Sequence, residues 1–288
     1  MAKKRVLITG AKGMLGSKLC SVLSGTCDCI GVDIDDFDIT DEQSVVRGVT
    51  AARPDIVLHC AAYTAVDKAE DDAERCSLIN EKGTTHIAQA AREAGAVMLY
   101  YSTDYVFDGK KDSPYVEADT PNPVSVYGRS KHAGEEAVKR ICERYFIVRI
   151  AWLFGENGKN IIQTILRLGK EKPSISFVND QFGSPTYTAD VALQTMQLLE
   201  RTEWGVYHCT AEGICTWYDV AGRTLAAAGI QTPVSPIATS AYPTRALRPA
   251  YSYLENANLK RLGINVMPAW ESGIDRYVHG LSNGMGNG

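Results

Sequence analysis

The sequence lacks the features that mark several classes of protein. No apolar run approaches the ~18 residues of a membrane-spanning helix. There is no basic excess of the kind a nucleic-acid-binding surface needs, because 30 Lys and Arg stand against 34 Asp and Glu, a net charge of −4. The N-terminal stretch MAKKRVLITG is basic and then apolar, but its apolar part, residues 6–8, is too short for a signal peptide. We therefore expect a cytoplasmic protein with neither a nucleic-acid nor a membrane partner.

The eight cysteines form no C-x-x-C pair. The two closest, Cys27 and Cys29, stand at alternate positions of a predicted strand. Reduced and mostly buried thiols fit this spacing better than a metal site or a disulfide framework does. No other cluster has metal-ligand spacing, so we predict no metal site.

Short apolar runs alternate with helical patterns along most of the chain, which is typical of a parallel sheet covered by helices. A length of 288 residues suits one large α/β domain or two smaller ones. We predict an α/β fold with a Rossmann-type doubly wound parallel sheet and a smaller C-terminal substrate-binding region. The apolar runs predict strands within 5–10, 27–33, 55–62, 96–104, 144–152 and 205–210.

The helical segments between these strands carry recognisable boundary signals. The stretch TDEQ, residues 40–43, resembles a capping box and predicts a helix that ends near Arg53, before Pro54. Residues 1–151 are expected to form the dinucleotide-binding domain, completed by elements within 186–210. Residues 152–288 are richer in proline and turns and are expected to form mainly the substrate-binding region. The low-complexity tail, 280–288, is predicted to be disordered.

A glycine-rich loop, TGAKGMLG, places Gly10, Gly13 and Gly16 between the first strand and the first helix. Three glycines alone are a weak signal, but these follow a strand, open a helix and begin a βαβ unit. Such glycines allow a tight turn, close approach of the backbone to a pyrophosphate, and close helix–strand packing. The helix N-terminus adds unpaired N–H groups for the phosphates. The loop predicts a site for NADPH or NADH.

Asp33 ends the second predicted strand. A carboxylate there can bind the 2′-hydroxyl of the adenine ribose, which favours NADH, whereas Lys12 in the glycine loop would partly offset repulsion of a 2′-phosphate. Asp33 also fits a simple turn residue, because three more aspartates follow within five residues. The choice between NADH and NADPH stays open.

The stretch VYGRSKHAGEE begins a helix with a tyrosine and a lysine on one line. Tyr127, Lys131, Gly134, Val138 and Ile141 fall at offsets 0, 4, 7, 11 and 14, a single helical stripe. A buried lysine is uncommon unless it is paired or functional. A snorkelling lysine is the alternative, but it does not explain the tyrosine one turn away. Charged residues predicted on the other faces of this helix are His132, Glu135, Glu136, Lys139, Arg140 and Glu143.

The pair has a chemical use. A free tyrosine has a pKa of ~10, and a nearby ammonium together with an oxidised nicotinamide favours the phenolate. Tyr127 would then give its proton to a carbonyl oxygen as hydride reaches the carbon, and Lys131 would also hold the nicotinamide ribose. Ser102 and Thr103 end a predicted strand, where ligands of open α/β sheets bind, and a hydroxyl there would orient the carbonyl. Taken alone, the same residues also fit a turn or a cap.

These motifs together resemble the extended short-chain dehydrogenase/reductases. The stretches AAYTAVDKAE, STDYVFDG, NDQFGSPT and RPAYSYL are more narrowly similar to the dTDP-4-dehydrorhamnose reductases, and the similarity runs from about Val6 to Trp270. The resemblance implies NAD(P)H-dependent reduction of the C4 ketone of dTDP-4-dehydro-L-rhamnose to dTDP-L-rhamnose. It also implies that Thr103 polarises the carbonyl, Tyr127 donates the proton and Lys131 tunes Tyr127.

Binding residues follow from the same resemblance. It places cofactor contacts on Gly10, Lys12, Gly13, Met14, Leu15, Gly16, Asp33, Asp38, Ile39, Ala61, Ala62, Tyr63, Tyr101, Tyr127 and Lys131. It places dTDP-sugar contacts on Thr103, Asp104, Trp152, Val66 and Arg248. Charge makes Arg248 a reasonable diphosphate partner, and Trp152 fits core packing at a strand end equally well.

Departures and alternatives accompany the resemblance. Met14 stands where related sequences often have Gln, which matters little because backbone groups bind the phosphates. Asp104 is followed by Tyr105, not by the second carboxylate of the related dehydratases, so reduction is favoured over elimination. A reductase or epimerase of another nucleotide sugar stays open, as does a non-catalytic cofactor-binding subunit resembling the beta subunit of methionine adenosyltransferase. A homodimer is a further expectation.

Overall fold

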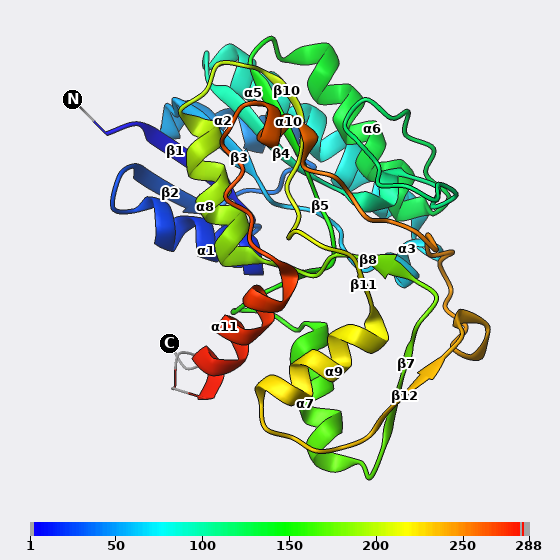
Figure 1. Cartoon of the computed structure of the whole chain (residues 1–288). Coiled ribbons are helices and arrows are strands. Elements are labelled where there is room, and N and C mark those ends of the chain that lie inside the picture. The colour runs from blue at the N-terminus through cyan, green and yellow to red at the C-terminus, as the bar shows by residue number, and fades with distance from the viewer. Residues whose placement is uncertain (1–2, 283, 285–288) are drawn as a thin grey trace.

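A six-stranded parallel sheet forms the centre of the computed structural model, which describes residues 3–282 and residue 284 (Figure 1). Its strand order is β10-β5-β4-β3-β1-β2. From β1 the chain first adds β2 on one side and then returns to add β3 on the other, so the topology reverses beside β1. The strands are β1 (Arg5–Thr9), β2 (Asp28–Val32), β3 (Ile56–His59), β4 (Val97–Thr103), β5 (Tyr145–Ile150) and β10 (Gly205–His208). All six lie within the predicted runs, and the Rossmann-type fold is confirmed.

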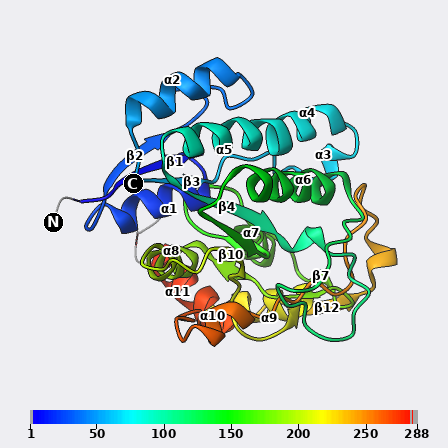
Figure 2. The same ribbon diagram turned by 90° about the horizontal axis from the view of Figure 1, so that it is seen from above.

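Helices cover both faces of this sheet (Figure 2). Leu7 of β1 packs into the core on one side, whereas its neighbours Val6 and Ile8 pack into the core on the other. Burial on both faces explains why the strands read as continuous apolar runs. One face carries α2 (Glu42–Ala52), α5 (Thr84–Glu93) and α6 (Val126–Ile141), and the other carries α1 (Met14–Leu23) and α8 (Thr188–Leu199). Between β3 and α5 the chain forms α3 (Val66–Ala69), α4 (Ala73–Ser77) and the π-helix η1 (Leu78–Gly83).

A second group of elements lies beyond the carboxyl end of the sheet (Figure 1). It has its own apolar core, built around Phe154, Ile165, Val220 and Ile274. Its helices are α7 (Ile161–Glu171), α9 (Trp217–Ala227) and α11 (Trp270–Ser282), and α10 (Ala257–Arg261) packs near β10. Short strands pair as β12 (Val234–Ile237) with β7 (Ile175–Val178), β6 (Leu153–Phe154) with β9 (Thr186–Tyr187), and β11 (Cys215–Thr216) with β8 (Phe182–Gly183). The single-turn helices are η2 (Asp104–Val106) and η3 (Thr239–Ala241). Across residues 3–282, no helix is long and apolar enough to cross a membrane.

Two local predictions are wrong. Helix α2 is capped by Asp41, whose Oδ1 accepts hydrogen bonds from the N–H groups of Gln43 (3.0 Å) and Ser44 (3.3 Å). Thr40 does not act as the cap because its own hydroxyl donates to Asp38. Disorder from residue 280 onward is also wrong for 280–282, which continue α11 on a face anchored by buried Tyr277. Residues 283 and 285–288 of the predicted tail lie outside the described residues.

Candidate functional site

A cavity of about 1220 Å³ opens at the carboxyl ends of β1, β3, β4 and β5. Its wall is formed by the glycine loop, by the ends of these strands, by the start of α6 and by Trp217 and Arg248 from the C-terminal region. All the predicted cofactor and substrate residues line it except Tyr63. The cavity therefore brings together segments that are more than a hundred residues apart in the sequence, while the role of each residue stays a prediction.

The backbone of Tyr63 is hydrogen-bonded to the side chain of Asn80. Its N–H donates to Asn80 Oδ1 (2.8 Å) and its carbonyl accepts from Asn80 Nδ2 (3.0 Å). Among the described residues that line the cavity, Ala62 and Thr64 are present on either side, but Tyr63 is not. The structure does not bring the Tyr63 side chain to the site.

The glycine loop is tightly packed. Gly10 has a φ of +67°, and a Cβ there would lie 2.7 Å from the Ala61 nitrogen. A Cβ on Gly16 would lie 2.1 Å from the Gly10 carbonyl oxygen, so helix α1 can approach this turn only with glycine at that position. Gly13 caps α1 without a side chain of its own, which leaves the first N–H groups of the helix facing the cavity region. This cradle fits the pyrophosphate of a dinucleotide.

The far end of the cavity, beside β2, is acidic. Asp33 Oδ2 accepts a hydrogen bond from the Lys12 backbone N–H (2.9 Å), and the Asp33 N–H donates to Asp36 Oδ2 (2.8 Å). The Lys12 ammonium is paired with Asp35, and this pairing raises the pKa of Lys12. Asp33 is thus both a turn residue and a residue of the cavity wall. A role in the turn therefore does not exclude the predicted contact with the adenine ribose.

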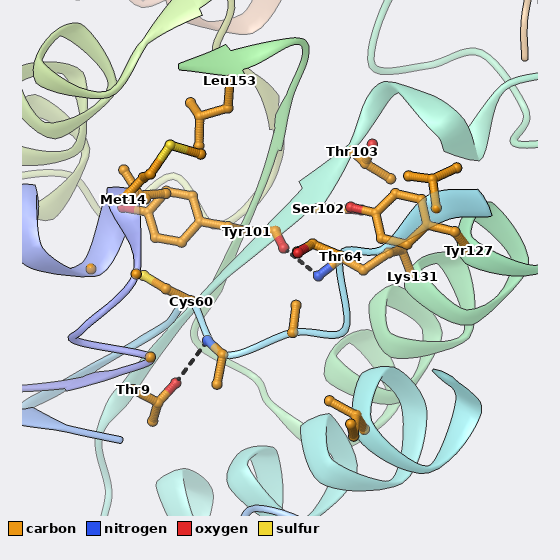
Figure 3. A pocket seen from close by; sticks show the side chains of 18 of the residues that line it. Thr9, Met14, Cys60, Thr64, Tyr101, Ser102, Thr103, Tyr127, Lys131 and Leu153 are labelled. Carbon is orange, nitrogen blue, oxygen red and sulfur yellow. Dashed lines mark hydrogen bonds between the residues drawn. The ribbon is translucent and has the colours of Figure 1, made fainter. Parts of the chain in front are cut away.

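Lys131 is buried and not a snorkelling surface residue. Only 3% of its surface is exposed, and its Nζ donates to the Tyr101 carbonyl (2.7 Å), as Figure 3 shows. The same Nζ lies 4.1 Å from the centre of the Tyr100 ring. Burial lowers the pKa of Lys131 to about 7, although the charge of Glu135 acts in the opposite direction. The ammonium is therefore close to its titration point at neutral pH.

Tyr127 lies across the same part of the cavity from the end of β4 (Figure 3). Burial raises the pKa of Tyr127 above its usual value, and a hydrogen bond with Thr103 opposes this rise. The predicted tendency toward phenolate is therefore not found, because burial and the neighbouring groups of Asp104, Tyr105 and Cys76 all raise the pKa of Tyr127. A raised pKa keeps the phenol protonated, the form that a proton donor needs.

Thr103 and Asp104 form a hydrogen-bonded pair beside the tyrosine. Thr103 Oγ1 donates to Asp104 Oδ1 (3.0 Å) and accepts from the Tyr105 N–H (3.2 Å). Asp104 is only 2% exposed, and burial raises its pKa to about 6. The ring of Tyr105 meets that of Tyr127 edge-on at 5.7 Å between centres. The Thr103 oxygen is thus held at the carboxyl end of β4 by two neighbouring residues.

A buried ion pair that the sequence pattern did not predict lies behind Lys131. Glu135 was expected on a face of α6 that points away from the buried stripe, and this prediction is wrong, because its side chain is fully buried. Its two carboxylate oxygens accept hydrogen bonds from Arg149 Nε (2.9 Å) and Nη2 (2.7 Å). Burial raises the pKa of Glu135, but the hydrogen bonds from Arg149, His132 and Ser102 together with the charge of Arg149 lower it to about 2. An arginine inside the apolar run RYFIVRIAW was the signal that a buried acid must lie nearby.

The wall that the C-terminal region adds to the cavity contains a second residue that the sequence pattern did not predict, Trp217. Its ring stacks on that of Trp152, with 3.6 Å between ring centres and 12° between planes. On the same side, Arg248 donates from Nη1 to the Tyr105 hydroxyl (2.9 Å) and from Nη2 to Asp67 Oδ2 (2.8 Å). Arg248 therefore reaches the cavity as predicted, but with a carboxylate partner already in place.

Comparisons with known proteins identify the family of this chain. Residues 4–283 match the family model described as RmlD substrate binding domain. The dTDP-4-dehydrorhamnose reductase of Escherichia coli is 37% identical, with 96% of this chain and 97% of the relative covered. The chain belongs to the dTDP-4-dehydrorhamnose reductase family. The enzyme of that name from Burkholderia thailandensis is 39% identical, again over 96% and 97% of the two chains.

A solved structure supports the same family membership. The dTDP-4-dehydrorhamnose reductase of Bacillus anthracis, in complex with NADP, is 41% identical and superimposes with a TM-score of 0.93. The match covers 96% of this chain and 98% of that one. The resemblance recognised from the sequence motifs is confirmed.

Proposed function

We propose that the protein reduces the C4 ketone of dTDP-4-dehydro-L-rhamnose to dTDP-L-rhamnose with NADPH or NADH. The observation that carries this proposal is the meeting of Thr103, Tyr127 and Lys131 at one cavity, beside a loop shaped for a dinucleotide. The relatives named above carry this activity in their names. A homodimer and a cytoplasmic location remain predictions from the sequence.

The residues present fit a nicotinamide dinucleotide. The N–H groups at the start of α1 would hold its pyrophosphate, and Asp33 and Lys12 would flank its adenine ribose. Bound in this way, the reduced nicotinamide supplies the hydride that the ketone carbon accepts. Lys131 lies on the same wall, near enough to the cavity to hold a ribose hydroxyl.

The proton comes from the protein. The Thr103 hydroxyl would turn from Asp104 to the ketone oxygen and orient it. Tyr127, kept protonated by burial, would donate its phenolic proton to that oxygen as the new C–H bond forms. The carbonyl thereby becomes an alcohol, and the phenolate left on Tyr127 is stabilised by the positive charge of Lys131.

A coupled assay of the full chain tests the proposal. Purified protein is mixed with dTDP-4-dehydro-L-rhamnose and either NADPH or NADH, while nicotinamide absorbance and the sugar product are followed. We expect oxidation of at least one cofactor and the appearance of dTDP-L-rhamnose. No oxidation with either cofactor would overturn the proposal and favour a non-catalytic cofactor-binding subunit, and interconversion of sugars without net oxidation would favour an epimerase.

A further inference from the structure

A row of three side chains crosses the sheet immediately behind the cavity wall. Thr9, His59 and Tyr100 are paired in register on β1, β3 and β4, and all three are buried. Thr9 and Cys60, which follows His59 in the chain, line the cavity. A histidine that is only 1% exposed needs a hydrogen-bond partner for each ring nitrogen. The partners of His59, at the centre of the row, show what this residue holds in place.

Both ring nitrogens of His59 have a threonine partner. Nδ1 lies 2.7 Å from Thr9 Oγ1, and Nε2 lies 3.1 Å from Thr84 Oγ1. The Thr84 hydroxyl donates its one proton to the Asn80 carbonyl oxygen (2.7 Å), so it accepts from the His59 Nε2–H. Burial and the charge of Lys131 lower the pKa of His59 to about 3, so the ring is neutral and carries a single N–H. The unprotonated Nδ1 therefore accepts a hydrogen bond from the Thr9 hydroxyl.

The Thr9 oxygen, with its proton directed at His59, holds the backbone beyond β3. The Ala61 N–H donates to Thr9 Oγ1 (3.3 Å; Figure 3), and the Cys60 N–H donates to the Thr9 carbonyl (3.2 Å). Ala61 is also the residue whose nitrogen a Cβ on Gly10 would meet at 2.7 Å. The Ala61 backbone is therefore fixed between the Thr9 side chain and the turn of the glycine loop.

The Nε2 side of the imidazole leads to the other end of the same segment. Asn80, whose carbonyl oxygen accepts the Thr84 proton, also binds the Tyr63 backbone through its side-chain amide, at the N–H (2.8 Å) and at the carbonyl (3.0 Å). Residues 60–64, of which all but Tyr63 line the cavity, are thus held at Ala61 and at Tyr63. The two anchors are connected through His59.

We propose that His59 is a positioning residue for the nicotinamide cofactor, which orients the Thr9 hydroxyl so that Thr9 fixes the Ala61 end of the cavity-lining residues 60–64. His59 is not among the described residues that line the cavity, so it acts through Thr9 and not by contact with the cofactor. A binding wall keeps its shape when the side chains behind it lock those that form it. The inference rests on the proposed function, since it assumes a nicotinamide dinucleotide in this cavity.

Cofactor affinity and stability, measured on the full chain, separate this role from a purely structural one. Fluorescence titration gives the affinities for NADPH and NADH, and urea unfolding gives the stability. His59→Phe keeps a ring stacked on Tyr100 but cannot accept from Thr9, and we expect it to weaken the tighter-binding cofactor by about fivefold, the effect of one hydrogen bond. His59→Asn should bind within about twofold of the wild-type affinity, because its amide oxygen can replace Nδ1 as the acceptor.

Thr9→Val breaks the same hydrogen bond from the other side, and it serves if His59→Phe fails to fold. Combining the two changes replaces both polar partners by apolar groups, so part of the stability lost in the single variants should return. The cofactor affinity should not return, because the Ala61 N–H still lacks the Thr9 oxygen. Val57→Ala is the matched control: Val57 is fully buried two residues earlier on β3, and its loss should lower stability while cofactor affinity stays within about twofold.

Cofactor affinity that simply follows stability would overturn the role of His59, whether it returns in the double variant or falls equally in Val57→Ala. Wild-type affinity in both His59→Phe and Thr9→Val, or an equal loss in His59→Asn and His59→Phe, would overturn it too. A wild-type protein that binds cofactor but reduces no ketone would reject the proposed function, while the same affinities still decide the role of His59. A wild-type protein that binds neither NADPH nor NADH would reject both.

Discussion

Glu135 and Arg149 form a two-point ion pair that is closed to solvent, one helical turn beyond Lys131. The exposed fractions of their side chains are 0% and 1%. A charge in such a place is tolerated only with its partner, because removing one member leaves the other charged and dehydrated. The pair links α6, which carries Tyr127 and Lys131, to β5 of the central sheet.

Glu135→Gln should therefore destabilise the protein by about 3–5 kcal/mol, measured by urea unfolding. The matched control is Glu136→Gln, the next residue, whose pair with Lys139 is exposed and worth under about 1 kcal/mol. Glu135→Gln combined with Arg149→Met should recover much of the loss. If Glu135→Gln and Glu136→Gln lowered the free energy of unfolding equally, the buried pair would not be important for stability.

Gly16→Ala should disrupt the cofactor site, because the new Cβ would lie 2.1 Å from the Gly10 carbonyl oxygen. Overpacking of this kind costs about 1–3 kcal/mol, and a strain of that size in the cofactor-binding turn corresponds to a loss of NADPH affinity of about 5- to 150-fold. Gly25→Ala is the control, since nothing lies within 4 Å of a Cβ there. Fluorescence titration with NADPH measures both variants, and similar affinities would show that the tight turn does not form the cofactor cradle.

The pH dependence of kcat/KM should report Lys131. Burial lowers its pKa in the free protein to about 7, so the ammonium is present below this pH and is lost as the pH rises through it. If the charge is needed, kcat/KM falls on the alkaline side of about pH 7. Lys131→Arg stays charged, and its residual activity should not show this fall. A flat wild-type profile, or the same fall in the arginine variant, would remove Lys131 from this role.

The lowered pKa of Lys131 also makes the stability of the protein depend on pH. Above the folded pKa of about 7 and below the ordinary value of 10.5, the unfolded chain binds a proton that the folded protein releases. The free energy of unfolding contributed by Lys131 should therefore rise with pH across this window. Lys131→Met should flatten that rise in urea unfolding series, and an unchanged slope would show that the lysine titrates normally.

Asp35→Asn should shift the preference toward NADPH. This change releases the exposed Lys12 ammonium from its partner and removes one of the carboxylates beside Asp33. The effect should be small, about two- to fivefold in the ratio of kcat/KM for the two cofactors, because the pair is exposed. Asp28→Asn, on the same strand as the acidic turn but paired with Arg5, should leave the ratio unchanged. A ratio that does not move in Asp35→Asn would place the adenine ribose elsewhere.

The sequence predicts those parts of the protein whose cause is local. Strands buried on both faces read as apolar runs, and the glycine loop follows from steric needs at Gly10 and Gly16. Features that depend on a partner far away in the sequence could not be predicted from the local pattern. Glu135 looks like a surface residue until Arg149 is seen opposite it, and Trp217 is an ordinary helix-start residue until the β8–β11 ladder brings it to Trp152.

The pKa of Tyr127 also depends on residues that are distant in the sequence. Spacing along a helix places a lysine near the tyrosine, but the degree of burial that raises the pKa of the phenol depends on the whole cavity wall. Tyr63 shows the converse case, because its neighbours in the chain reach the cavity while its backbone is tied to Asn80. Family resemblance names the residues of a site, and only the packing shows which of them face it.

Tyr127→Phe removes the proposed proton donor while leaving the ring in place. Turnover should fall by about 10²- to 10⁴-fold, the usual contribution of a positioned acid. The affinity for NADPH should stay within about twofold of the wild-type value in the same titration used for Gly16→Ala. Retained turnover would remove Tyr127 from the proton-donor role.

Isotope transfer from the nicotinamide to the sugar measures the proposed hydride step itself. NADPH or NADH carrying deuterium at the transferable position of the nicotinamide is incubated with the protein and dTDP-4-dehydro-L-rhamnose, and the sugar is analysed by NMR. We expect the wild-type protein to form dTDP-L-rhamnose with deuterium at C4, and Tyr127→Phe to form almost none over the same time. A rhamnose product without deuterium at C4, or an unconverted ketone with both cofactors, would contradict it.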